Sequence, residues 1–190
     1  MTFIKQLMMA KGRGQTVISV ADASMMVPEY SGNKLWSALK YAVASGDLIR
    51  LTRGIYVFER NYSHLELANK LRIPSYVSMY TVLQKEGVVF QPYESVYMIA
   101  SRSQRIEVDN QNYIYRRIKA EILLNTRGIE IVDRVSMANT ERALCDKLYL
   151  DGNEHFDNLR GIDWEEMRNL NRVIYGGNKT IADFIEENGE

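Results

Sequence analysis

Residues 31–58 read SGNKLWSALKYAVASGDLIRLTRGIYVF. The first half of this stretch places Leu35 and Leu39 on one helical face and stops at Gly46, which predicts a single amphipathic helix. The second half is rich in branched and aromatic residues around a tight step at Gly54, which predicts a two-stranded hairpin with one apolar face. A helix that leads into a hairpin therefore sets the frame for the N-terminal third of the chain.

Two shorter helices are predicted before this stretch. Apolar spacing favours a helix from Phe3 to about Gly12, then a small strand over residues 15–19. Ser19 or Asp22 can cap a second helix, which Pro28 ends. Three helices followed by a hairpin are the order of a winged helix-turn-helix, in which the third helix enters the major groove of DNA. We therefore expect a winged helix-turn-helix DNA-binding domain over residues 1–60.

Polar side chains follow the third helix and the hairpin, opposite the buried stripe. Asn pairs with adenine, Lys with guanine or phosphate, and Ser and Tyr with phosphate oxygens. Basic residues beside the hairpin turn lie where a wing touches the DNA backbone. The candidate DNA-binding residues are Asn33, Lys34, Ser37, Lys40, Tyr41, Arg50, Thr52 and Arg53. The simpler alternative is an ordinary solvated surface.

The pattern of helical and β-prone segments over residues 61–190 predicts an α+β domain with an antiparallel sheet and flanking helices. One helix is expected up to Pro74 and another over residues 75–87. A strongly amphipathic helix capped by Asn139 or Thr140 and two further helices should close the chain. Between these helices, the predicted meander strands are Val88–Phe90, Val96–Ile99, Ile106–Val108, Tyr113–Tyr115, Ile122–Leu124 and Ile129–Val132.

Composition narrows the functional classes. The one cysteine excludes an intramolecular disulfide, and two histidines are too few for a Cys/His zinc site in one chain. No apolar stretch reaches the ~20 residues of a membrane helix, and no secretory signal is evident, so we expect a cytoplasmic protein without a membrane partner. The net charge is zero, yet basic residues exceed acidic ones by four over residues 1–60. This excess of basic residues in the N-terminal part of the chain favours an anionic partner.

Catalytic motifs are missing from the sequence. It contains no phosphate-binding glycine loop and no Gly-x-Ser-x-Gly elbow. Asp163, Glu165 and Glu166 could hold a divalent cation, but carboxylates that open a helix also favour its dipole. The tyrosines of the middle region could stack on nucleotides, although cross-strand pairing explains them more simply. We therefore expect no catalytic residue, no cofactor and no metal site.

Four short motifs occur in a fixed order. They are Leu51-Thr-Arg-Gly-Ile-Tyr56, Pro74-Ser-Tyr-Val-Ser78, Tyr113-Ile-Tyr-Arg116 and Ala138-Asn-Thr-Glu-Arg-Ala-Leu-Cys-Asp-Lys-Leu-Tyr149. Together, over about residues 15–150, they resemble the AbiEi-type antitoxin and transcriptional regulator family of bacterial type IV toxin–antitoxin systems. The sequence departs from the family pattern in having Arg142 where Lys is usual and Val82 where Ala is typical.

The resemblance implies two activities. The winged helix would bind inverted repeats in double-stranded DNA upstream of its own operon and act as a repressor. Its DNA contacts would fall on Lys34, Ser37, Lys40, Tyr41, Arg50 and Arg53. The domain over residues 61–190 would counteract a nucleotidyltransferase-like toxin without forming a stable complex with it. The motifs at 74–78 and 141–149 would hold that domain together.

Two other functions stay open at this point. The winged helix can serve as a docking module of a protein-interaction adapter, and the tyrosine-rich sheet can belong to a nucleotide-acting enzyme. If the target is an inverted repeat, two winged-helix domains are needed. A homodimer or two monomers that bind cooperatively can supply them.

Overall fold

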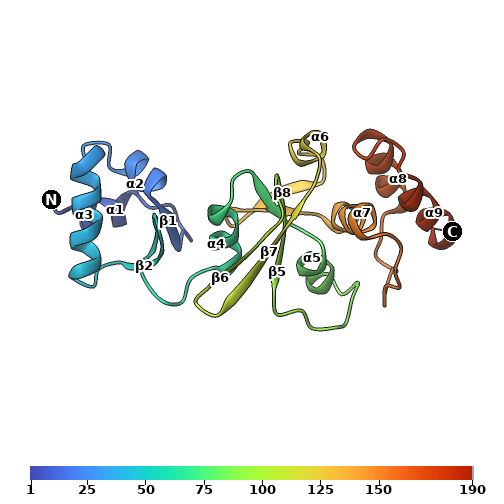
Figure 1. The fold of residues 1–190 in the computed structure, drawn as a ribbon, viewed down its shortest axis with the longest axis horizontal. Helices are drawn as coiled ribbons and strands as arrows, with labels where there is room; N and C mark the ends of the chain where they lie inside the picture. The colour runs from blue at the N-terminus through green and yellow to red at the C-terminus, as the bar shows by residue number, and fades with distance from the viewer. Residues whose placement is uncertain (190) are drawn as a thin grey trace. The chain divides into compact units, whose positions relative to one another are not determined.

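The chain divides into two compact units between Leu71 and Arg72, as the computed structural model of residues 1–189 shows (Figure 1). Unit 1 comprises residues 1–71, and unit 2 begins at Arg72. The sequence placed the boundary after residue 60. It lies later because the helix that follows the hairpin is bonded to unit 1.

Unit 1 contains the helices and the hairpin that the sequence predicts. Its strands form an antiparallel sheet in the order β1-β3-β2. Apolar side chains from the first three helices and from the sheet form its core. The elements are α1 (Phe3–Ala10), β1 (Val17–Ser19), α2 (Val20–Met26), α3 (Gly32–Ala44), β2 (Ile49–Thr52), β3 (Ile55–Val57) and α4 (His64–Leu71).

Helix α2 begins at a reciprocal cap. The Ser19 hydroxyl accepts a hydrogen bond from the Asp22 backbone N–H at 3.0 Å, and the Asp22 carboxylate accepts one from the Ser19 N–H at 2.7 Å. Such a pair satisfies two N–H groups that a helix start leaves open. Ser19 is thus the cap, and Asp22 is its partner. Ser31 precedes α3, but its side chain makes no capping bond.

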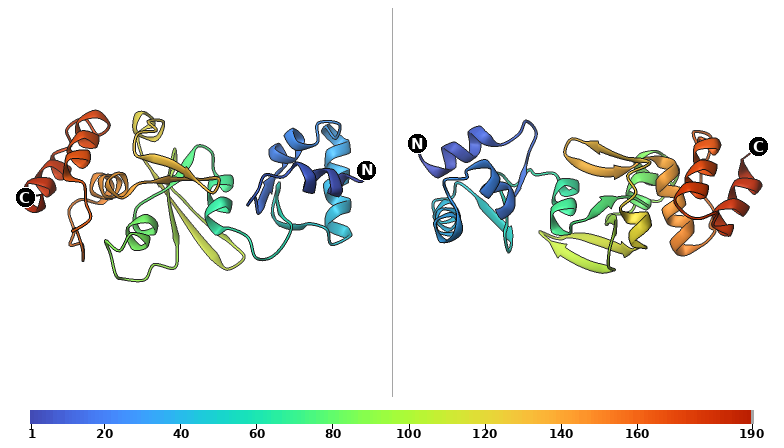
Figure 2. Two further views of the ribbon diagram at one scale, coloured as in Figure 1. Left: turned by 180° about the vertical axis from the view of Figure 1, so that it is seen from behind. Right: turned by 90° about the horizontal axis from the view of Figure 1, so that it is seen from above.

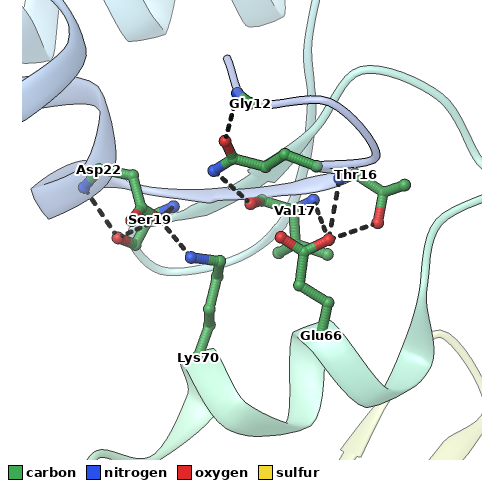
Figure 3. A network of polar contacts seen from close by, with 8 residues as sticks. Gly12, Thr16, Val17, Ser19, Asp22, Glu66 and Lys70 are labelled. Atoms are coloured by element: carbon green, nitrogen blue, oxygen red, sulfur yellow. Dashed lines mark hydrogen bonds and ion pairs between the residues drawn. The ribbon is translucent and has the colours of Figure 1, made fainter. Parts of the chain in front are cut away.

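Helix α4 is fastened to unit 1 by two charged side chains (Figure 3). Oε2 of Glu66, which is buried, accepts hydrogen bonds from the Thr16 N–H and hydroxyl at 2.8 and 2.7 Å, and from the Val17 N–H at 3.1 Å. Lys70 Nζ lies 2.7 Å from the Asp22 carboxylate. Burial raises the pKa of Asp22, but the bonds from Lys70 and from the helix cap outweigh it, so this pKa lies below its usual value.

Unit 2 is built on a six-stranded sheet in the order β6-β7-β5-β4-β9-β8. Helices α7, α8 and α9 pack against one another beside it (Figure 2). The expected α+β class is confirmed. The elements are β4 (Ser75–Val77), α5 (Tyr80–Lys85), β5 (Val96–Ala100), β6 (Gln104–Val108), β7 (Gln111–Arg117), α6 (Ala120–Leu123), β8 (Ile129–Val132), β9 (Val135–Ala138), α7 (Thr140–Asp151), α8 (Trp164–Val173) and α9 (Lys179–Asn188).

The sheet is not the simple meander that was predicted. Three neighbouring pairs are antiparallel, but β5 pairs with β7 and β4 pairs with β9 in parallel. The expected helix over residues 75–87 is confirmed only in its second part, α5, because its first part is β4. Val77 in β4 lies between Met98 of β5 and Met137 of β9, so pairing across the sheet overrides the local pattern.

Two short apolar runs predicted as strands adopt other structures. Ile122 and Leu123 lie in helix α6, where the Leu123 N–H bonds to the Lys119 carbonyl at 2.9 Å. Residues 88–90 form no strand, since the Val88 N–H bonds back to the Leu83 carbonyl. In both places a local turn buries the first two apolar side chains without a ladder of strand bonds and leaves the third, Phe90 or Leu124, exposed.

Helix α7 is buried almost all round instead of being amphipathic. All eight residues from Glu141 to Leu148 are buried. The charges of Arg142 and Asp146 are fully buried, with Arg142 Nε 3.7 Å from Asp146 Oδ1. Charged side chains inside a protein need partners, and these two have each other and the hydroxyl groups around them. The helix is therefore the central element of unit 2.

Candidate nucleic-acid interface

Helix α3 separates its apolar and polar residues as predicted. Leu35, Leu39 and Ala42 face the core, and Val43 is half-buried. The opposite side is open to solvent, and Tyr41 keeps 74% of its surface exposed. Every predicted contact on this helix is exposed, namely Asn33, Lys34, Ser37, Lys40 and Tyr41.

The hairpin presents two arginines near its turn. Arg50 and Arg53 are exposed, while Thr52 is half-buried. Arg50 Nε donates to the Thr52 carbonyl at 3.3 Å, which ties the side chain along the strand. Gly54 at the turn has a φ of +78°, a left-handed conformation that glycine adopts without strain. The two arginines therefore flank a turn whose left-handed backbone conformation Gly54 favours.

A hollow of about 320 Å³ lies between α3 and the hairpin. Two basic residues predicted from separate segments, Lys40 and Arg50, line it together. Trp36 lines it as well and is 49% exposed. Trp36 is not among the candidate DNA-binding residues predicted from the sequence. The sequence could have identified it by its position on the helix. Trp36 follows Leu35 directly, so it lies about 100° around the helix axis from Leu35 and outside the buried face.

A second hollow, a groove of about 710 Å³, lies between α1 and α3. It is lined by Lys34, Ser37 and Tyr41 from the predicted set. Lys34 is already engaged, because its Nζ donates to the Glu29 carbonyl at 3.0 Å and lies 4.3 Å from the centroid of the Tyr30 ring. In this position Lys34 braces the loop before α3. The predicted residues therefore fall on both flanks of one helix.

The charge of unit 1 favours an anionic partner. The unit contains nine Lys and Arg residues against five Asp and Glu residues, and the segment that forms α3 contains no carboxylate. Of the five acids, Asp22 is paired with Lys70 and Glu66 is buried. Lys40 and Arg53 have no carboxylate partner among residues 1–189. The outer side of α3 and the hairpin turn therefore carry net positive charge.

In unit 2 the two motifs that the resemblance singled out come together. The Asp146 carboxylate accepts hydrogen bonds from Ser78 at 2.7 Å, Tyr175 at 2.8 Å and Tyr76 at 3.1 Å. Arg142 donates to the Tyr76 hydroxyl at 3.2 Å. Burial raises the pKa of Asp146 more than Arg142 and the three hydroxyls lower it. These buried groups bond to one another within the protein, which is the geometry of a structural centre.

The tyrosines and the acidic cluster considered for an enzyme have structural contacts. The rings of Tyr80 and Tyr93 stack at 4.1 Å, and Tyr97 meets both edge-on. Asp163 caps α8 by accepting from the Glu166 N–H at 3.0 Å. Within residues 1–189 no group of three His, Cys, Asp or Glu residues is placed to hold a metal ion.

No protein-family model matches the chain, and no curated protein matches it. Among the described residues, no helix has both the length and the apolar character needed to cross a membrane.

Proposed function

We propose that unit 1 is a winged helix-turn-helix that binds double-stranded DNA, and that the protein is a transcriptional regulator. The single observation that carries this proposal is the outer side of α3, which is exposed, free of carboxylates and flanked by basic residues of the hairpin. The element order α1-β1-α2-α3-β2-β3 supports it, since winged helices insert the third helix into the major groove.

The side chains divide into two roles. Asn33, Ser37 and Lys40 lie on the outermost side of α3 and would reach base edges and nearby phosphates. Arg50 and Arg53 would contact the phosphate backbone beside the groove. Lys34 would act mainly by holding the loop before α3.

The resemblance to AbiEi-type regulators adds a target and a second activity. The target would be an inverted repeat upstream of the protein's own operon, which the protein would repress. The second activity, through the C-terminal unit, would be to counteract a nucleotidyltransferase-like toxin without a stable complex. Both remain predictions that rest on the motifs at 51–56, 74–78 and 138–149.

The test is a titration of the full chain against its own upstream duplex and a scrambled duplex, followed by fluorescence anisotropy. We expect preference for the upstream duplex and steep weakening between about 50 and 300 mM salt, because phosphate contacts release counterions. The double variant Lys40→Ala/Arg53→Ala should weaken binding by roughly tenfold or more.

The matched control is Lys179→Ala, which removes an exposed charge from α9 of unit 2. Its affinity should equal that of the unaltered chain. Equal losses in the control and the double variant would contradict the assignment of α3 and the hairpin. No binding at low salt would favour the adapter, in which this domain docks onto a protein.

A further inference from the structure

Strand β8 forms one edge of the sheet in unit 2, and β6 forms the other (Figure 2). The β6 edge exposes charged side chains, Arg105 and Glu107, which discourage pairing with another strand. At the centre of β8 stands Ile131, a branched apolar residue that is 81% exposed. Its neighbour Val132 is 43% exposed. The two edges thus differ in what they offer to a further strand.

The register of β8 shows which backbone groups face outward. Asp133 and Arg134 form a two-residue turn with φ values of 47° and 68°, and Val132 is paired with Val135 across it. In such a hairpin the pair that closes the turn exchanges hydrogen bonds, and bonded pairs then alternate along the ladder. The N–H and C=O of Ile131 therefore point away from β9.

The next outward position agrees with this assignment. The Ile129 N–H bonds to the Thr126 carbonyl at 3.0 Å instead of to β9, and the Asn139 N–H bonds to the Gly128 carbonyl at 2.8 Å on the inner side. The outward donor and acceptor of Ile131 are the pair that a strand related by a two-fold axis can use. In an antiparallel pair centred on this residue, each copy of Ile131 donates to the other and accepts from it.

We propose that a second copy of this chain pairs through β8, antiparallel and centred on Ile131, so that two copies form one continuous sheet. The two Ile131 side chains then lie directly opposite each other and cover each other's exposed surface. A two-fold contact uses the same patch on both copies, so every favourable contact occurs twice.

Charge complementarity supports this partner. In the proposed register, Glu130 of each copy lies opposite Val132 of the other, and Val132 lines a hollow together with Lys85. Glu130 of each copy therefore approaches Lys85 of the other.

A small hollow of about 200 Å³ lies beside the same edge. It is lined by Glu130, Val132 and Lys85, among others. Lys85 Nζ lies 3.2 Å from the Glu86 carboxylate and 3.9 Å from the Met137 sulfur. Glu130 of the second copy, opposite Val132, would enter this hollow and meet the ammonium group. Backbone bonds with a side-chain pocket alongside are the usual basis of strand addition.

The contact is small, so the dimer should be weak in free solution. It should be more populated when the unit 1 domains of two copies occupy one inverted repeat. The first measurement is sedimentation velocity of the full chain without DNA, from about 10 to 500 μM, a range that suits interfaces of low area. We expect the average mass to rise from monomer toward dimer, and Ile131→Lys to abolish the rise by placing two like charges on the axis. Val173→Lys, on the exposed surface of α8, is the matched control and should dimerise normally.

A charge exchange tests the register. Glu130→Lys and Lys85→Glu should each weaken the dimer several-fold, and the double variant should restore it, because only the pair recreates opposite charges. A second readout rests on the proposed function: an inverted repeat should bind two copies cooperatively, and Ile131→Lys should remove the cooperativity while leaving affinity for a single half-site unchanged.

A chain that remains monomeric at 500 μM and binds the repeat without cooperativity would overturn the proposal. So would an Ile131→Lys variant that dimerises as the unaltered chain does. Failure to bind the half-site would instead contradict the DNA-binding function, and the sedimentation result would still decide whether β8 pairs.

Discussion

Units 1 and 2 use charged residues in opposite ways. In unit 1 the basic residues of α3 and the hairpin lie at the surface, on a helix that buries only apolar side chains. In unit 2 the central helix α7 buries Arg142, Asp146 and Lys147 beneath the surface and pairs each of them. The comparison teaches that charged residues on a helix indicate a candidate interface only where they lie at the surface, because buried charges are already paired inside the protein.

The largest expected effect comes from breaking the buried charge network. Arg142→Ala leaves Asp146 charged and buried without its guanidinium partner, which typically costs about 3–5 kcal/mol. The chain has two tryptophans, Trp36 in unit 1 and Trp164 in unit 2. Urea unfolding of the Trp36→Phe protein, followed by Trp164 fluorescence, should therefore show this loss in unit 2.

The control for that loss is Arg168→Ala, which removes an exposed arginine of α8 that pairs with Glu165 at 3.6 Å. Exposed pairs of this kind contribute about 0–1 kcal/mol. If Arg142→Ala costs no more than Arg168→Ala, the contrast between the two units is lost.

The next effect concerns the boundary between the units. Glu66→Ala removes the acceptor of three hydrogen bonds in unit 1, so its free energy of unfolding should fall by about 3 kcal/mol. Trp36 fluorescence in a Trp164→Phe background reports it, and the exposed Glu59→Ala is the control. An unchanged midpoint would mean that α4 does not stabilise unit 1, and a boundary after residue 60 would then describe the chain better.

A smaller effect concerns the exposed basic residues of unit 1 and the salt dependence of DNA binding. Each phosphate contact on duplex DNA contributes about 0.9 to the slope of log affinity against log salt. Lys40→Ala/Arg53→Ala should therefore flatten that slope by about 1.8 if both residues meet phosphates. A flattening of only about 0.9 combined with weaker binding would leave Arg53 on a phosphate and assign Lys40 to base edges, because base contacts carry little salt dependence.

The smallest effect is a pH dependence in unit 1. The folded-state pKa of Asp22 is lowered from 3.8, since its bonds with Lys70 and Ser19 outweigh the effect of burial. A lowered carboxyl pKa stabilises the folded state above the unfolded pKa, and this contribution is lost as the pH falls through the folded pKa. The melting temperatures of the unaltered chain and of Asp22→Asn should differ at pH 7 and converge below pH 3.8.

The sequence was most informative where structure is local. The spacing of Leu35 and Leu39, the cap at Ser19 and the turn at Gly54 depend on neighbours a few residues away, and the elements of unit 1 follow from them. The candidate residues of α3 were found in the same way. That Lys40 and Arg50 share one hollow depends on how the hairpin folds back, which spacing does not encode.

Long-range pairing decided what the sequence did not predict. Tyr76 meets Asp146 from seventy residues away, and that partner allows charged residues of α7 to be buried. A helical wheel assigns Arg142 and Asp146 to a solvent side, because it contains no term for a distant hydroxyl or guanidinium group. The strand β4 was missed for a similar reason, since its neighbours come from β5 and β9.

Cys145 lies in the middle of α7 and is fully buried, and burial raises the pKa of its thiol well above the usual value. Because it is the chain's only cysteine, every alkylation of a thiol must occur at this one position. The thiol becomes reactive when α7 leaves its packing, so the rate of labelling by a thiol reagent measures how often the centre of unit 2 opens. Cys145 therefore serves as an internal probe of unit 2. Its labelling rate can be measured by mass spectrometry in a crude lysate without adding a dye or a tag.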